Sequence, residues 1–495
     1  MPSRNYLVFD FGASNGRAMV AQYDGEKIDI KEVHRFENRP VFAGGTLYWD
    51  ILRLYSELKI GIQKSVKEFK DISSMGINSW AIDFGFLDKN GKLISNPYNY
   101  RDQSRSGSEE EVFKLFPREE LFKLTGGMLI PIMSLFQIYY FIKNGAVEIT
   151  SGKKFLMIPD IFNYFLTGEV FNEFTNFTTT LMYNQGQKRV EEKIIEKIGL
   201  SKDIFPEMII PGTYIGDLKK PICDKLEINK IPVIAPATHD SASAIAGIPV
   251  QSSHKCWAFL SIGTWCFVGI ETDSPVINEK VLKTGFANLG GVEGRNLLSK
   301  DITGLWIIQQ CREKWIKEMG KNISWDEIVK FSDTARDIQS FIDVDDPDFS
   351  EPSTDMPQKV IEACRRRGQD VPRDIGEIAR CIYQSMVMKF KLNFKLLEDV
   401  ISEKIETLHI IGGGIYNKSL CQWIADATGI FVYAGPAETT SIGNALMQLK
   451  NSGEIKTLED GRTLSLNSSV INCYEPRDTG KWGEAYEGYK ELLGQ

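Results

Sequence analysis

The sequence is poor in the residues and spacings that build metal sites. It has only 4 histidines in 495 residues, and none of them stands in an H-E-x-x-H pattern. Its 8 cysteines form no C-x-x-C pair and no zinc-type spacing. Cysteines scattered in this way are expected to be buried small hydrophobes, not disulfides. We therefore expect no transition-metal site built by the protein alone, and any metal should arrive with a ligand.

Long apolar runs and a basic charge excess are also absent. No uninterrupted apolar stretch reaches the roughly 20 residues that span a bilayer. The start, Met1–Asn5, carries one positive charge and no apolar run, which is unlike a signal peptide. A net charge of −8 argues against a nucleic-acid surface, and Arg365–Arg367 is expected to be the solvated end of a helix. The sequence thus predicts a soluble cytoplasmic protein with neither membrane nor nucleic acid as a partner.

Two common nucleotide-binding motifs are missing as well. The chain has no G-x-x-x-x-G-K-[ST] loop, which excludes a P-loop NTPase, and no G-x-G-x-x-G that opens a helix in a dinucleotide-binding unit. What is present is ordinary globular composition, with 42% apolar and 25% charged residues. A chain of 495 residues exceeds the size at which one hydrophobic core stops growing, so two domains are expected.

A strand–turn–strand pattern occurs twice. Two extended apolar runs flank a short turn in Tyr6–Ala21 and again in Trp257–Ile270, which is typical of a hairpin. When the two segments are superimposed, Gly12 aligns with Gly263. This internal similarity indicates two related domains that meet near residues 245–252.

Helices and strands alternate between these hairpins. Asp50 can cap a helix whose apolar residues recur every three or four positions, and Asp374 can cap a longer one. The second helix leads into the strand 408–411, which ends in Gly412–Gly414. Alternation of this kind predicts an α/β protein.

Three glycine turns therefore follow strands, at Gly12, Gly263 and Gly412–Gly414. Glycine after a strand allows a phosphate to approach the backbone and its N–H groups. Asp10 stands beside the first turn, where it could hold Mg²⁺ directly or through water. It could equally cap the turn.

Two further segments could carry chemistry. The strand 231–235 runs into Asp240, which could cap the following helix or accept a proton from a substrate hydroxyl. Trp80 and Asp83 could line a sugar pocket, because aromatic faces pack on sugars and carboxylates bind hydroxyls. A buried tryptophan and a turn-adjacent aspartate would give the same pattern.

Taken together, these segments resemble the FGGY family of carbohydrate kinases from Tyr6 to about Leu449. The sharpest matches are Asp10–Arg17, Trp80–Asp83, Thr238–Ser243, Ser261–Trp265, Gly290–Arg295 and Gly412–Asn417. Within the family the chain is most similar to rhamnulokinases. They share the Gly-Ala-Ser-x-Gly-Arg start, the paired Gly290 and Gly294, the segment Tyr100–Asp102 and the run Glu173–Thr180.

The resemblance implies an α/β two-domain actin-like (ribonuclease H-like) fold with ATP and sugar in the interdomain cleft. It implies a sugar-binding domain over 1–248, a nucleotide-binding domain over 249–450 and a peripheral segment over 451–495. Asp240 would be the catalytic base, and Asp10 would hold Mg²⁺, through water. The implied ATP contacts are Ala13, Ser14, Asn15, Gly16, Arg17, Thr264, Gln309 and Gly413. The implied sugar contacts are Trp80, Ala81, Asp83, His239, Ser241 and Asp301.

Two departures from the rhamnulokinase pattern fall on the sugar side. Position 81 is usually Gly in a Trp-Gly-Val-Asp run, and position 301 is usually Asn. The leading hypothesis is ATP-dependent phosphorylation of L-rhamnulose at its 1-hydroxyl in sugar catabolism, by a monomer or homodimer. L-fuculokinase or another ketose kinase is the alternative within the family. An actin- or Hsp70-type ATPase and an inactive sugar-binding regulator are the alternatives outside it; the Asp83 and Asp240 pair argues against the first, and intact Asp10, Asp240 and Thr264 argue against the second.

Overall fold

The computed structural model describes residues 3–251, 253–351 and 353–494, and these form two compact units. Unit 1 comprises Met1–Gln251, Glu271–Leu298 and Glu438–Ser469, and unit 2 comprises Ser252–Ile270, Ser299–Ala437 and Val470–Gln495. Both units mix strands and helices, so the predicted α/β class is confirmed. The segment 451–495 is divided between the units, and the domain limits expected from the sequence remain a prediction.

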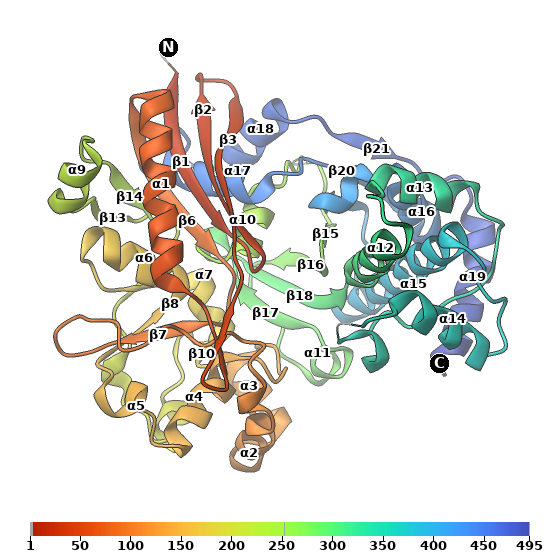
Figure 1. Cartoon of the computed structure of the whole chain (residues 1–495), viewed down its shortest axis with the longest axis horizontal. Coiled ribbons are helices and arrows are strands. Elements are labelled where there is room, and N and C mark those ends of the chain that lie inside the picture. The colour runs from red at the N-terminus through yellow and green to blue at the C-terminus, as the bar shows by residue number, and fades with distance from the viewer. Residues whose placement is uncertain (1–2, 252, 352, 495) are drawn as a thin grey trace. The chain divides into compact units, whose positions relative to one another are not determined.

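Unit 1 is built on a six-stranded sheet with the order β13-β14-β6-β1-β2-β3 (Figure 1). β1 pairs with β2 in antiparallel and with β6 in parallel register, and β6 pairs in parallel with β14. The predicted hairpin at the start of the chain is therefore confirmed. The strands are β1 (Arg4–Phe11), β2 (Asn15–Tyr23), β3 (Ile28–Glu37), β6 (Ile72–Ser79), β13 (Tyr214–Asp217) and β14 (Pro232–Ile234).

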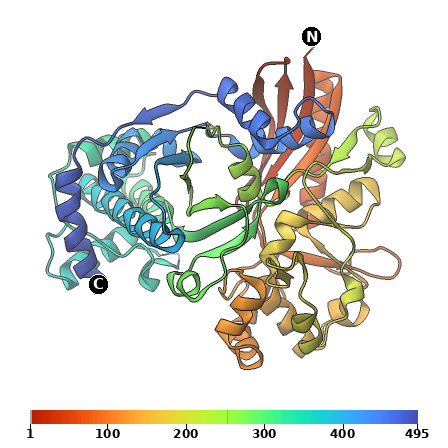
Figure 2. The same cartoon turned by 180° about the vertical axis from the view of Figure 1, so that it is seen from behind.

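Helices cover both faces of this sheet. α1 (Ile51–Phe69) and α6 (Ile158–Thr167) pack on the face that carries Leu7, Phe9 and Phe11, and together they form a buried core (Figure 1). Alternate residues of a strand point to opposite faces. α17 (Thr439–Asn451) contacts the same strands (Figure 2). Gln448 of α17 and its C-cap residue Ser452 bond Ser74 and Tyr6, which point to the other face.

The helix starts follow the sequence in one case and differ in another. The Asp50 side chain accepts a hydrogen bond from Arg53 N, which confirms it as the cap of α1. Asp240, in contrast, is the first residue of α10 (Asp240–Ala246), and the N-cap is His239, whose side chain makes no capping bond. The suggestion that Asp240 caps this helix was wrong, because the chain turns one residue earlier.

Smaller elements complete unit 1. The strand pairs are β4 (Val41–Ala43) with β5 (Thr46–Tyr48), β7 (Phe84–Leu87) with β8 (Lys154–Met157), β9 (Asn172–Glu173) with β12 (Met208–Ile209), and β10 (Tyr183–Asn184) with β11 (Arg189–Val190); β17 spans Ala287–Gly290. The remaining helices are α2 (Ser108–Leu115), α3 (Arg118–Thr125), α4 (Ser134–Lys143), α5 (Val147–Ser151), α7 (Phe174–Phe177), α8 (Glu192–Lys197), α9 (Lys220–Leu226), α11 (Glu279–Thr284) and α18 (Leu458–Ser468).

Unit 2 repeats the hairpin at the centre of its own sheet. β15 (Trp257–Ile262) pairs in antiparallel register with β16 (Trp265–Thr272), as predicted, and in parallel register with β19 (Thr407–Ile411). The strand order continues through β20 (Phe431–Ala434) to β21 (Asn472–Tyr474), with β18 (Asn296–Thr303) on the other side of β16. The chain crosses from one unit to the other within β16 and β18.

The helices of unit 2 gather around one long member. α15 (Ile375–Ile401) begins after Asp374, whose side chain accepts from Glu377 N, so the predicted capped helix is confirmed. It contacts every other helix of the unit (Figure 2). These are α12 (Trp306–Met319), α13 (Trp325–Thr334), α14 (Met356–Arg366), α16 (Lys418–Thr428) and α19 (Thr479–Leu492). Most cysteines are buried as expected; Cys473 is exposed.

Candidate active site

The predicted sugar and base residues of unit 1 meet at the carboxyl ends of its parallel strands. β1, β6 and β14 run side by side, and their ends are tied together by Trp80 N to Phe11 O at 3.1 Å and by Ser79 N to Thr238 O at 2.9 Å. Ligands of open α/β sheets bind outside this edge. The edge therefore brings together the turn after Phe11, the segment Trp80–Asp83 and the segment Thr238–Ser241.

Asp240 projects from the first turn of α10 with its side chain about 30% exposed. Its Oδ1 accepts from Ser241 N at 2.6 Å and from Ser241 Oγ at 3.2 Å. His239 Nε2 lies 3.7 Å from the same oxygen, and burial lowers the pKa of His239 to about 4. The imidazole is therefore neutral at pH 7, so it adds no positive charge beside the Asp240 carboxyl.

The start of α10 can lie close to its neighbour because both helices carry small residues. A Cβ on Gly443 of α17 would lie 1.9 Å from Ser243 O, and a Cβ on Gly247 would lie 2.2 Å from Thr439 O. Only glycine fits at these two points. The small residues after Asp240 thus serve a close helix–helix contact with α17, which fixes the position of the Asp240 turn.

Asp83 is buried and holds a pair of indole rings. Its Oδ2 accepts from Trp49 Nε1 at 2.5 Å, from Trp80 Nε1 at 3.1 Å and from Tyr100 N at 3.3 Å. Its Oδ1 accepts from Gln137 Nε2 at 3.3 Å. The two indole centroids are 4.2 Å apart. Asp83 thus sets the orientation of both tryptophans.

Burial dominates the protonation of Asp83. It raises the pKa to about 6, although the two indole N–H groups and the charge of Arg105 act in the opposite direction. Tyr100 lies within the electrostatic reach of both carboxyls: burial raises the pKa of Tyr100, and the charges of Asp83 and Asp240 add to that shift. Ala81, between Trp80 and Asp83, is half-buried at this edge.

The sequence indicated that the N–H groups of the first glycine turn would face a phosphate, but the Gly12 N–H is used within the turn. Gly12 N donates to Asn15 O at 2.8 Å within the turn, so it is not free for a phosphate. Ser14 and Asn15 are exposed at the tip, and Ala13 is half-buried. Gly16 is required by packing, because a Cβ there would lie 2.3 Å from the ring of Phe36.

Arg17 and Asp10 form an ion pair across this hairpin. Arg17 Nη2 donates to Asp10 Oδ2 at 2.7 Å, and Arg17 Nη1 donates to Glu438 Oε1 at 2.9 Å. Burial alone would lower the pKa of Arg17, but the charges of the two carboxylates raise it. The guanidinium is thus fixed between two acids. Since Mg²⁺ takes few protein oxygens and keeps several waters, an Asp10 already bonded to Arg17 suits contact through water better than direct ligation.

The predicted nucleotide residues of unit 2 meet at the equivalent end of its sheet. Thr264 Oγ1 donates to Gln309 Oε1 at 3.1 Å, and Leu305 N donates to Gly263 O at 2.8 Å, which docks the start of α12 on the hairpin turn. Gly263 N donates to Trp265 O at 3.1 Å, as Gly12 does in unit 1. Asp301 lies on β18 and is exposed.

The glycines after β19 divide into two kinds. Gly412 has φ +80°, and a Cβ on it would lie 2.9 Å from Ile262 O; a Cβ on Gly414 would lie 2.4 Å from the Ile262 side chain. These two allow the turn to pack on the end of β15. Gly413 is exposed and a Cβ on it would meet no atom within 4 Å. Gly413 therefore leaves open space over the backbone, which suits the approach of a ligand.

Several residues of this arrangement escaped sequence reasoning. Trp49, just before α1, and Gln137 of α4 both bond Asp83, and Glu438 reaches Arg17 from 421 residues away. No sequence signal marks these partners. Glu173 lies in a segment that the sequence singled out, yet it was given no role. Glu173 Oε2 accepts from Thr238 Oγ1 at 2.8 Å and from Thr238 N at 2.9 Å, two residues before Asp240.

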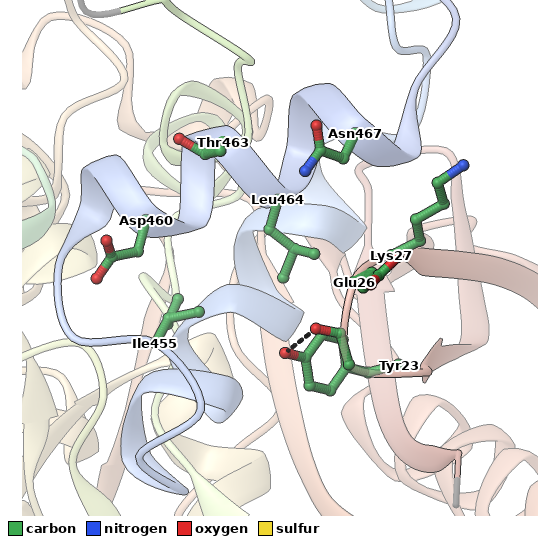
Figure 3. Close-up of a pocket in the computed structure, with 9 residues that line it drawn as sticks. Tyr23, Glu26, Lys27, Ile455, Asp460, Thr463, Leu464 and Asn467 are labelled. Atoms are coloured by element: carbon green, nitrogen blue, oxygen red, sulfur yellow. Dashed lines mark hydrogen bonds between the residues drawn. The ribbon is translucent and has the colours of Figure 1, made fainter. Parts of the chain in front are cut away.

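A separate pocket lies elsewhere on unit 1 and contains none of the predicted site residues. It has a volume of about 520 Å³ and lies between the β2–β3 turn and α18 (Figure 3). Tyr23 closes one side and donates its hydroxyl to Gly25 O at 3.0 Å.

Among the described residues, no group of three or more His, Cys, Asp and Glu side chains is placed to hold a metal. The described helices include none that is long and apolar enough to cross a membrane.

Comparison with known proteins gives a consistent result over the whole chain. The models of the FGGY family of carbohydrate kinases match with the N-terminal domain at 5–247 and the C-terminal domain at 258–452. A rhamnulokinase of Bacteroides thetaiotaomicron is 36% identical over 490 residues, which is 99% of each chain.

Solved structures extend the likeness to the fold. A ligand-bound xylulose kinase from Lactobacillus acidophilus superimposes with a TM-score of 0.80 at 13% identity, over 99% of this chain and 98% of that one. A Plasmodium falciparum glycerol kinase with ADP gives 0.79 at 17% identity, with the same coverage. The predicted two-domain actin-like fold is confirmed.

Proposed function

Because the chain belongs to the FGGY family of carbohydrate kinases, we propose that it transfers the γ-phosphoryl group of ATP to the 1-hydroxyl of L-rhamnulose. The family makes the protein a carbohydrate kinase that uses ATP. The finer assignment of the sugar is carried by one observation, the full-length similarity to proteins named rhamnulokinase at 36%, 35% and 33% identity.

In this proposal the carboxylate of Asp240 is the general base. It is partly exposed at the strand-end edge, beside a neutral His239 and held by Ser241 N. It accepts the proton of the 1-hydroxyl while that oxygen forms a bond to the γ-phosphorus. The bond from phosphorus to the β,γ-bridging oxygen breaks, and ADP leaves. Phosphoryl transfer needs positioning and charge stabilisation more than covalent help, so one well-placed base is sufficient.

The sugar would be bound by the rest of the unit 1 edge. The indole pair Trp49 and Trp80 offers aromatic surface, and Asp83 fixes both rings. Ala81 lies between Trp80 and Asp83 in the sequence, and we place its methyl group against the sugar; the family resemblance assigns Asp301 to the sugar as well. These two differ from the rhamnulokinase pattern, which keeps L-fuculose as the second candidate substrate.

The nucleotide would be bound by the turns. The exposed tip Ala13–Asn15, the fixed charge of Arg17, and Thr264 with Gln309 would contact ATP, and Gly413 would let it approach the backbone of unit 2. Mg²⁺ would enter with ATP, held by Asp10 through water, and would neutralise phosphate charge. The protein itself supplies the base, the orientation of the sugar and the backbone contacts.

A panel of sugars in a coupled ADP-release assay tests the assignment. L-rhamnulose, L-fuculose, D-xylulose and glycerol are each supplied with ATP and Mg²⁺, with a no-sugar control. We expect the highest kcat/KM with L-rhamnulose. A higher value with L-fuculose would move the assignment to the second candidate. ADP release at the same rate without sugar would replace a kinase by an ATPase, and tight sugar binding without turnover would indicate a regulator.

A further inference from the structure

Glu173 is a fully buried carboxyl at the junction of β9 and α7 in unit 1. It caps α7: Oε1 accepts from Thr175 N at 2.9 Å, and Oε2 accepts from Thr175 Oγ1 at 2.6 Å. A serine or asparagine would meet this need with one oxygen. A glutamate with two oxygens and a longer stem thus brings more than a cap requires.

Glu173 also accepts hydrogen bonds from Thr238, in the segment that carries Asp240. Oε2 also accepts from Thr238 N at 2.9 Å and from Thr238 Oγ1 at 2.8 Å. The next backbone group along, His239 N, donates to Thr175 Oγ1 at 3.3 Å. Glu173 and the threonine it holds therefore bind two consecutive N–H groups immediately before Asp240.

Burying the Glu173 carboxyl beside that of Asp160 costs free energy that a simple helix cap would not require. Among the described residues no Lys, Arg or His forms an ion pair with Glu173, and Asp160 Oδ2 accepts from Glu173 N at 3.1 Å. Burial raises the pKa of both carboxyls, and the charge of Glu173 raises that of Asp160 further. Buried acids without a counter-ion are unfavourable unless their hydrogen bonds are complete. The bonds from 175 and 238 supply that compensation and lock the two segments together.

We propose that Glu173 is a positioning residue for the kinase reaction: it holds the backbone and hydroxyl of Thr238 and so aims the Asp240 carboxylate at the sugar hydroxyl. The inference rests on the proposed role of Asp240 as the base. A shift of about 1 Å in a catalytic group can cost about 10²-fold in rate. Loss of the Glu173 bonds should therefore lower kcat and leave ATP binding intact.

The test measures kcat and both KM values for E173Q, T238V and T238S, each with a thermal melt. We expect E173Q to lower kcat by about 10- to 10²-fold with the KM for ATP changed by less than about threefold. T238V should lower kcat in the same direction, and T238S, which restores the hydroxyl, should recover it. The matched control is E191Q. Glu191 is also a buried helix-capping glutamate of unit 1, bonded to Lys193 N and Asn184 Nδ2, and it makes no contact with Thr238.

A double-mutant comparison distinguishes a positioning role of Glu173 from a general loss of active-site structure. If Glu173 acts through Asp240, E173Q added to D240N should lower the remaining turnover by less than about twofold. An equal fold-loss in the parent and in D240N, or a parental kcat for E173Q, would overturn the inference while leaving the base assignment intact. If E173Q does not fold, T238V in the parent and in D240N carries the same comparison. Parental turnover by D240N would instead overturn the base assignment, and this inference with it.

Discussion

The hairpins that open the central sheets of the two units share a backbone and differ in chemistry. In both, an antiparallel pair is joined by a turn whose glycine N donates back into the turn, Gly12 to Asn15 O and Gly263 to Trp265 O. In both, the first strand also pairs in parallel with a strand that ends at the same edge. In unit 1 that edge carries carboxylates and indoles, and in unit 2 it carries a hydroxyl, an amide and open glycine backbone. One scaffold thus presents two different sets of side chains.

This difference leads to a division of tasks that kinetics can test. If the segments Trp80–Asp83 and Thr238–Ser241 of unit 1 supply the base and sugar contacts, changes in them should act on kcat and on the KM for the sugar. If Thr264 and Gly413 of unit 2 supply nucleotide contacts, changes at these turns should act on the KM for ATP. A substitution in either set whose effect falls on the other substrate would break the comparison.

The largest effect is expected at Asp240. A general base typically contributes about 10²–10⁴-fold, so D240N should lower kcat by that order. The KM for ATP should change little, because the nucleotide contacts lie elsewhere. Steady-state kinetics with a thermal melt on the same preparation makes the measurement. The control is D224N, an exposed aspartate paired with Lys220 in α9. A folded D240N enzyme within about threefold of the parent would rule out this role.

A smaller effect, on the other substrate, is expected at Thr264. T264V keeps the shape of the side chain and removes the hydroxyl that bonds Gln309. One lost hydrogen bond should raise the KM for ATP by about tenfold, with the KM for the sugar unchanged. T334V is the matched control, since Thr334 bonds only its own helix in unit 2. A change in the KM for the sugar alone would move Thr264 to the sugar side.

The sugar specificity should respond to one residue in each unit. A81G and D301N restore the residues usual in rhamnulokinases, so each should raise the ratio of kcat/KM for L-rhamnulose over L-fuculose. A methyl group or one hydroxyl contact is worth about 10-fold or more in such ratios. Competition between the two sugars in one reaction measures the ratio directly. If both variants alter only the KM for ATP, the placement of these residues against the sugar is wrong.

The ionisation of Asp83 is expected to act on stability. Its folded pKa of about 6 lies above the ordinary aspartate value of 3.8. Between about pH 4 and about pH 6 the unfolded chain loses the proton of this carboxyl, while the folded protein keeps the carboxyl neutral because burial disfavours its charge. This contribution therefore lowers the free energy of unfolding with rising pH, by roughly 3 kcal/mol in total.

D83N removes this titration and keeps an acceptor for the indoles. Relative to the parent, D83N should gain stability between pH 4 and pH 7. Denaturant unfolding of both proteins across this range gives the difference. If the two free energies of unfolding run parallel with pH, Asp83 titrates at its ordinary pKa and the argument from burial fails.

Sequence patterns predicted the local structure well where the signal was local. Asp50 and Asp374 cap helices as expected, and both glycine hairpins form, because periodicity and capping act over a few residues. The meeting of Trp80 and Thr238 at one edge follows from parallel strands. The partners of Asp83 and of Arg17 could not be predicted, because Gln137 and Glu438 come from distant segments that only tertiary packing brings close. Asp240 was misplaced by one residue as a helix cap, because Asp is a preferred N-cap residue whereas His239, which takes that position, is not.

The most direct test of the account is the identity and amount of the product. L-rhamnulose is incubated with ATP and Mg²⁺, the phosphate ester is located by ¹³C and ³¹P NMR, and ADP is counted in the same sample. The account predicts a phosphomonoester on C1 in a ratio of one to one with ADP, and formation of both slowed by about 10²–10⁴-fold with D240N. ADP formed without a sugar phosphate, or a phosphate on another carbon, would contradict it.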